Sequence, residues 1–139
     1  MFNKYFSKYH DTAYVIFRIV IGLLFFVHGT QKFLGWFDAK AAAPFMSIFW
    51  IAGVIETIVG PLIALGLFTR LAALIGACDM IGAYLIGHIG LFSSRLHSVL
   101  PYQNGGELAL LYLVSFFIII IYGAQKASLD KAIFGKEIF

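Results

Sequence analysis

The stretch that decides the fold is TAYVIFRIVIGLLFFV, residues 12–27. It is a long apolar run in which Arg18 is the only charged residue. Continued as a helix to Phe33, this run is close to the ~20 residues that cross a ~30 Å hydrocarbon core at about 1.5 Å per residue. Lipid offers the backbone no hydrogen-bond partner, so a spanning segment of this kind must be helical. The sequence therefore predicts a membrane-spanning helix over residues 12–33.

Three further apolar stretches follow, and we expect helices over residues 48–68, 71–89 and 107–123. The connections are short enough to place neighbouring helices antiparallel, as in a bundle. We therefore predict an all-α fold: an integral membrane four-helix bundle forming one domain over residues 1–139. No tandem repeat or low-complexity tract is evident in the sequence.

The composition is consistent with lipid as the surrounding solvent. Hydrophobic residues make up 61% and charged residues 12% of the chain, against roughly 45–50% and about 25% in ordinary globular domains. So few charges cannot cover a small domain in water. The net charge of +3 is spread along the chain, so we exclude nucleic acid as a partner. Cys78 is the single cysteine, so an internal disulfide or a redox thiol pair cannot form.

The distribution of Lys and Arg predicts an orientation in the membrane. Six of these residues flank the expected helices on the side of both termini (Lys4, Lys8, Arg70, Lys126, Lys131 and Lys136), and three lie on the opposite side (Lys32, Lys40 and Arg95). Short loops rich in positive charge stay in the cytoplasm. We therefore expect both termini on the cytoplasmic side of a multi-pass protein of the cell membrane. Arg18 interrupts the first apolar run, which argues against a cleaved signal peptide.

Several ionisable residues lie inside the expected helices, where they are costly and usually face the bundle interior. Arg18 shares one helical face with Lys32, and similar stripes on the next two helices contain Glu56 and Asp79. Counting helical rise from the cytoplasmic edge places these two carboxylates near the depth of Arg18. We therefore expect Arg18 to neutralise Glu56, Asp79 or both. The alternative is that such buried pairs only fix helix register.

Polar residues also gather at the opposite, outer end of the expected bundle. His28, Lys32, His88, Asn104 and Glu107 fall near one level there. These side chains suggest a polar pocket that opens outward. The candidate site residues are Arg18, His28, Lys32, Glu56, Asp79, Asn104 and Glu107.

A metal site is a weaker interpretation of the same residues. His28, His88, His97 and Glu107 have suitable ligand chemistry for Zn or Fe. No HExxH or Glu-x-x-His pair is present, so we predict no metal ligands and leave this set open.

Several short motifs follow one another along the chain: RIVIG at 18–22, HGTQK at 28–32, Glu56, GLFTR at 66–70, NGGELAL at 104–110 and SLD at 128–130. The ordered set resembles the DoxX family of small four-helix membrane proteins. Relatives include subunits similar to those of thiosulfate:quinone oxidoreductase and proteins associated with redox-stress proteins. Because this chain has no thiol pair, the resemblance does not imply sulfur oxidation here. The resemblance implies a functional role for these shared residues: Arg18, His28, Lys32, Glu56, Asn104 and Glu107.

Together these observations favour a redox-associated membrane subunit that binds a quinone or a similar apolar ring in the outer half of the bundle. His28 and Lys32 would hydrogen-bond a carbonyl oxygen, and Glu107 or Glu56 would relay protons. One alternative is a non-enzymatic scaffold that stabilises a partner protein. Another is a carrier of small solutes or protons, which with four helices would need a homo-oligomer. The sequence leaves open whether the protein is an enzyme, which redox partner it meets and its oligomeric state.

Overall fold

The computed structural model describes residues 9–37, 42–93 and 96–138, and in these ranges the chain forms helices and no strands. The elements are α2 (His10–Leu34), α3 (Ile48–Leu65), α4 (Thr69–Gly82), the π-helix η1 (Ala83–His88), α5 (Pro101–Asn104), α6 (Glu107–Tyr122) and α7 (Leu129–Phe134). Each of the four apolar stretches in the sequence thus coincides with helical structure, and the fold is all-α as predicted.

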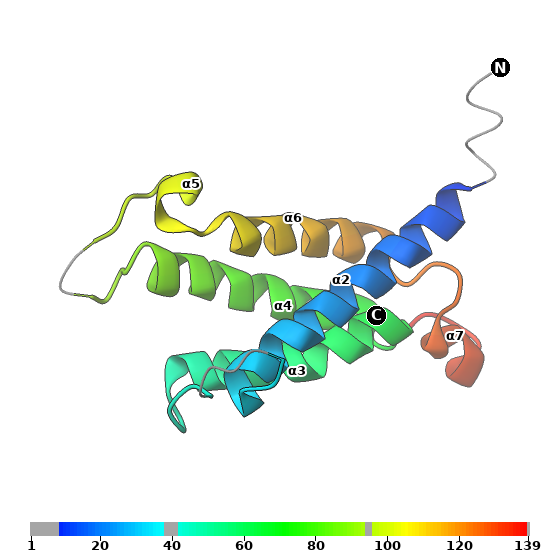
Figure 1. The fold of residues 1–139 in the computed structure, drawn as a ribbon. Helices are drawn as coiled ribbons and strands as arrows, with labels where there is room; N and C mark the ends of the chain where they lie inside the picture. Colours follow the sequence, from blue (N-terminus) through cyan, green and yellow to red (C-terminus); the bar gives the residue numbers. More distant parts are fainter. Residues whose placement is uncertain (1–8, 38–41, 94–95, 139) are drawn as a thin grey trace, which may run out of the picture.

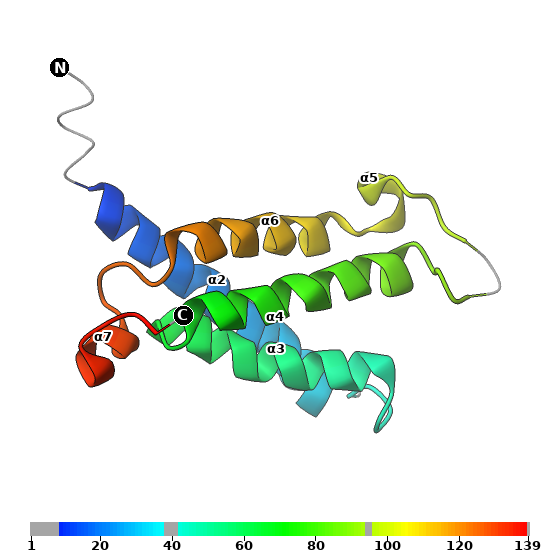
Figure 2. The same ribbon diagram turned by 180° about the vertical axis from the view of Figure 1, so that it is seen from behind.

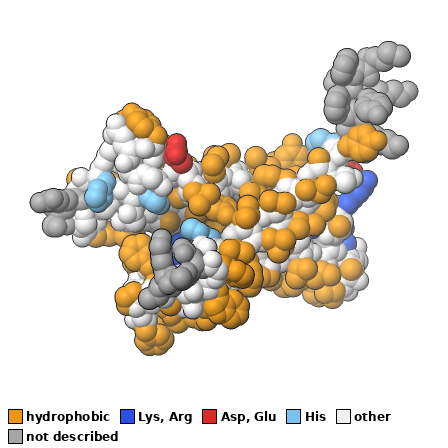
Figure 3. Space-filling model, in the orientation of Figure 1, with side chains coloured by type: hydrophobic (Ala, Val, Ile, Leu, Met, Phe, Trp, Pro, Cys, Tyr) orange, Lys and Arg blue, Asp and Glu red, His pale blue; other side chains and the backbone are white. Residues whose placement is uncertain are grey.

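In the part of the chain that the structure describes, three helical segments are long and apolar enough to cross a membrane: His10–Leu34, Ile48–Leu65 and Thr69–His88, which joins α4 to η1. The fourth apolar helix, α6, has 16 residues and is shorter than these three. Hydrophobic side chains cover most of the middle of the face shown in Figure 3, and Lys and Arg side chains gather at the end where the termini lie. This surface is that of a membrane protein, because lipid rather than water can solvate it.

Helices α2 and α3 make the most extensive contact, and glycines bring their backbones together. A Cβ atom at Gly22 would lie 2.6 Å from the carbonyl oxygen of Gly60, and one at Gly29 would lie 2.5 Å from the backbone nitrogen of Thr57. Small residues allow this approach in membrane helices, where van der Waals packing replaces the hydrophobic effect.

Helices α4 and α6 run side by side, and α2 crosses them at an angle (Figures 1 and 2). Phe25 of α2 meets Phe116 of α6 edge to face, with 4.8 Å between ring centroids, and both side chains are fully buried. Gly76 of α4 leaves room for the Phe116 ring, whose nearest atom would be 2.9 Å from an added Cβ. These aromatic contacts close the core between the two helix pairs.

At the end of the molecule that carries the termini, the buried Arg18 binds backbone carbonyl groups. Its Nη1 donates to the oxygen of Ala124 at 2.9 Å, and its Nη2 donates to the oxygens of Ala127 at 2.8 Å and Ala64 at 3.4 Å. The predicted pairing of Arg18 with Glu56 or Asp79 is therefore wrong. Helical rise fixes depth alone, whereas the segment that follows α6 supplies carbonyls that have no helical partner.

The turn between α3 and α4 is held to the start of α7. The backbone nitrogen of Phe68 donates to both carboxylate oxygens of the buried Asp130, at 3.1 and 3.0 Å, and Ser128 Oγ donates to the oxygen of Gly66 at 3.0 Å. Gly66 and Phe68 both have positive φ, 73° and 47°. The GLFTR and SLD motifs thus form one structural unit that fixes a strained turn.

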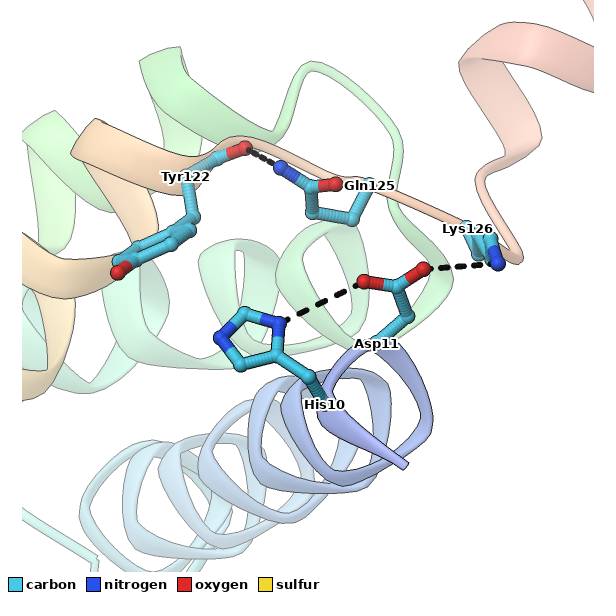
Figure 4. A network of polar contacts seen from close by, with 5 residues as sticks. All are labelled: His10, Asp11, Tyr122, Gln125 and Lys126. Carbon is cyan, nitrogen blue, oxygen red and sulfur yellow. Dashed lines mark hydrogen bonds and ion pairs between the residues drawn. The ribbon is translucent and has the colours of Figure 1, made fainter. Parts of the chain in front are cut away.

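Exposed polar groups surround the start of α2 at the same end (Figure 4). Asp11 lies 2.7 Å from the ammonium of Lys126 and 3.5 Å from the His10 ring nitrogen, and Gln125 donates to the oxygen of Tyr122. Because these groups are solvent-accessible, the contacts contribute little stability.

Candidate functional site: an apolar cavity beside a buried charge cluster

A cavity of about 680 Å³ lies at the end of the molecule far from the termini. Helices α2, α3, α4, η1 and α6 all contribute to its wall, which is mainly apolar. The polar or reactive groups in the lining are His28, Lys32, Cys78, Asp79, His88 and Tyr112. A largely apolar cavity with a few converging polar groups is typical of a small-molecule site.

Three ionisable side chains, one from each of three helices, form a cluster at the cavity wall. The ammonium of Lys32 on α2 donates to Glu56 Oε1 on α3 at 2.7 Å. Glu56 is fully buried, and its carboxyl group interacts with that of Asp79 on α4. Lys32 and Asp79 line the cavity, whereas Glu56 lies behind them. The cluster therefore connects a buried carboxyl with the cavity surface.

The π-helix η1 brings His88 to the cavity. Asp79 and His88 are two and a half turns apart on a regular α-helix, which would place them on opposite faces. The wider turn of the π-helix rotates the later residue, and both side chains line the cavity. His88 Nδ1 lies 3.1 Å from the backbone oxygen of Asn104, which ties η1 to the end of α5.

His28 of α2 also lines the cavity, next to an aromatic side chain of α6. Its ring centroid is 6.4 Å from that of the buried Tyr112, and Tyr112 in turn contacts Phe25. The cavity thus has a flat aromatic surface beside a ring that can donate or accept hydrogen bonds.

The structure brings His28, Lys32, Glu56 and Asp79 of the predicted site together and separates the others from it. Arg18 lies at the opposite end of α2, in the carbonyl network described above. Asn104 acts on the loop: its Nδ2 donates to the oxygen of Ser98 at 2.8 Å and its Oδ1 accepts from the nitrogen of Gly106 at 2.8 Å.

Glu107 does not line the cavity, contrary to expectation. It is exposed and borders a separate shallow groove with Leu111 and Val114. The buried face of α6 contains Ala109, Tyr112 and Phe116, and Glu107 is off that face. The spacing of these three residues could have revealed both the exclusion of Glu107 and the inclusion of Tyr112.

The four residues considered as metal ligands are also dispersed. His28 and His88 line the cavity, whereas His97 is exposed and Glu107 faces the groove. Within residues 9–37, 42–93 and 96–138, no three His, Cys, Asp or Glu side chains are grouped to hold a metal ion.

The fold and the site define a small helical membrane protein with an apolar cavity, and comparison with known proteins gives its family. The DoxX family profile matches residues 13–89, more than half of the chain. An uncharacterized protein of Haemophilus influenzae is 37% identical over 133 residues, covering 94% of this chain and 97% of the relative. The chain belongs to the DoxX family.

Two further relatives carry more descriptive names. The "Putative oxidoreductase CatD" of Bacillus subtilis is 28% identical over 138 residues, covering 94% of this chain and 95% of the relative. The "Uncharacterized membrane protein Rv3486" of Mycobacterium tuberculosis is 35% identical over 80 residues, covering 52% of this chain and 48% of the relative. No solved structure matches the chain significantly.

Proposed function

We propose that this DoxX protein is a redox-associated membrane subunit that binds a quinone or a similar flat apolar ring in the cavity. The observation that carries the proposal is the cavity itself, about 680 Å³ in volume and apolar apart from a few polar groups. That volume is within the roughly 300–1,000 Å³ of ligand pockets. The name of the Bacillus subtilis relative supports an association with oxidoreductase chemistry.

His28 and Lys32 are the groups that would orient such a ring. Lys32 uses one of its three ammonium hydrogens on Glu56, and its side chain lines the cavity, where another hydrogen can reach a carbonyl oxygen. His28 faces the same space beside Tyr112, so an imidazole N–H and an aromatic surface are available together. A bound quinone would supply two-electron, two-proton redox chemistry, with a partner protein as the other party.

The proposed membrane topology of the protein rests on the distribution of Lys and Arg and on the apolar helices. We place α6 as the fourth membrane helix, which completes the four-helix bundle, and both termini in the cytoplasm. Arg70, Lys126, Lys131 and Lys136 lie at the end of the termini, which supports that side as cytoplasmic. The cavity then opens in the outer half of a multi-pass protein of the cell membrane.

Binding of a short-chain quinone such as menadione to the detergent-solubilised protein tests the proposal. We expect saturable quenching of intrinsic fluorescence and a rise in melting temperature. His28→Ala should weaken the affinity by about tenfold, the effect of losing one hydrogen bond to a ligand.

The matched control is Glu107→Gln, because Glu107 faces the separate groove. This variant should bind menadione as the unchanged protein does. Absence of saturable binding to the unchanged protein, or equal affinity in His28→Ala, would refute the proposed function.

A further inference from the structure

Glu56 and Asp79 form a carboxyl pair in which each group has one buried oxygen that no described residue donates to. Lys32 occupies Glu56 Oε1, while Glu56 Oε2 and Asp79 Oδ2 are buried and receive no hydrogen bond from the described residues. The two carboxyl groups nevertheless interact with each other. Two ionised carboxylates placed in this way would repel each other and leave two buried acceptors unpaired.

One proton resolves both problems at once. A single proton on the pair turns one carboxyl into a donor for the other, as in known carboxyl pairs that share a site. Together with the ammonium of Lys32, the cluster then has no net charge, which is the least costly state in a low-dielectric environment.

From this geometry we infer that Glu56 and Asp79 share one proton and that ligand binding in the cavity is linked to that proton. The inference rests on the proposed function for the identity of the ligand. Asp79 is the member of the pair that lines the cavity, so the proton exchanges through Asp79. This gives Asp79 the role in proton handling that the sequence assigned to Glu107 or Glu56.

The sign of the linkage follows from the charge of the cluster. Loss of the proton leaves a net negative charge against the cavity wall, and an apolar ligand excludes the water that would solvate it. The ligand therefore binds more tightly to the protonated cluster. Above the pH at which the pair loses its proton, the Kd should rise about tenfold per pH unit, as expected for one linked proton.

Other titratable groups line the same cavity: His28 from α2, His88 from η1 and Tyr112 from α6. Protonation of His28 would add positive charge to the cavity, so it would weaken apolar binding as pH falls. Loss of the proton from the carboxyl pair instead weakens binding as pH rises. The two effects therefore change the Kd in opposite directions with pH and can be told apart.

The test measures the Kd of menadione as a function of pH in the unchanged protein and in Asp79→Asn, Glu56→Gln and Glu107→Gln. Asp79→Asn and Glu56→Gln each leave one carboxylate opposite Lys32, so the cluster is neutral without a titrating proton. In both variants the alkaline rise in Kd should disappear, whereas Glu107→Gln should retain it. The inference would be overturned if menadione binds but its Kd does not rise at alkaline pH in the unchanged protein, or if that rise persists in Asp79→Asn. Either result would leave the proposed function standing.

Infrared spectroscopy tests the shared proton without any ligand. The unchanged protein at neutral pH should show the carbonyl band of a buried protonated carboxyl, and Asp79→Asn and Glu56→Gln should each lose it. Retention of this band in Glu107→Gln would identify the pair as its source. If the unchanged protein lacks the band, both carboxylates are ionised and the inference fails, even if menadione binds; if the band is present and menadione does not bind, only the proposed function fails.

Discussion

Two cationic side chains on one face of α2 have partners of different kinds. Arg18 is fully buried and donates to backbone carbonyls, whereas the partly buried Lys32 pairs with the carboxylate of Glu56. The guanidinium suits the first role because its planar fork can serve several acceptors at once. The ammonium of Lys32 suits the second because it concentrates charge next to a carboxylate.

Arg18→Met should strongly destabilise the protein. The substitution leaves the carbonyls of Ala124 and Ala127 without their donor, and breaking such a buried charged network costs about 3–5 kcal/mol. Chemical unfolding in detergent, followed by circular dichroism, measures the loss. Lys126→Met is the control, because its pair with Asp11 is exposed and should contribute under about 1 kcal/mol.

Double-mutant cycles should separate the true ion pair from the one expected from depth alone. Lys32→Met combined with Glu56→Gln should show a coupling free energy of about 0.5–3 kcal/mol, because the two side chains are in contact. Arg18→Met combined with Asp79→Asn should be additive within about 0.5 kcal/mol. Strong coupling in the second cycle would contradict the partners assigned to Arg18.

At the scale of elements, the distance between α2 and α3 is set by glycine. Gly22 and Gly60 face each other across the crossing, and a Cβ on Gly60 would lie 2.6 Å from the oxygen of Gly22 and from the nitrogen of Phe26. Both obstructing atoms belong to the backbone, so the helices themselves would have to separate. This crossing also places Lys32 next to Glu56, which links helix packing to the cavity.

Gly60→Ala should therefore destabilise the protein and disturb the cavity. Overpacking of this kind costs about 1–3 kcal/mol, and menadione affinity should fall together with stability as α2 moves. Unfolding in detergent and menadione binding provide the two readouts. Gly82→Ala is the matched control for stability: apart from its own stretch of helix, nothing lies within 4 Å of its Cβ position, so the change should be neutral or stabilise by up to about 1 kcal/mol.

Across the whole molecule, the two ends have different roles. The end that carries the termini is fixed by Arg18, Ser128 and Asp130, which bind backbone groups. The opposite end contains the cavity and the Lys32–Glu56–Asp79 cluster. Rigid contacts at one end support a site at the other, where side chains must remain available to a ligand.

Thiol labelling of cells should reveal the orientation of these ends. In a Cys78→Ser background, Lys131→Cys should react with a membrane-impermeant maleimide only after the cells are opened, and His97→Cys should react in intact cells. Both positions are exposed and lie at opposite ends of the helices. The reverse pattern would place the termini outside and contradict the positive-inside assignment.

The amino-acid sequence by itself determined that the protein is helical and resides in a membrane. Long apolar runs are a local property, and lipid leaves their backbones no alternative to the helix. Periodicity also identified the inward faces: Arg18, Gly22, Phe25 and Gly29 are all buried on α2 as their spacing predicts. These conclusions needed no knowledge of which helices are neighbours.

Only the tertiary structure decided which polar groups meet. Arg18 binds carbonyls of the segment that follows α6, and a π-helix rotates His88 into the cavity. These outcomes depend on the rotation of each helix about its axis and on the path of the chain between helices. Sequence spacing fixes depth and face within one helix, but the contacts between helices follow from packing the whole molecule.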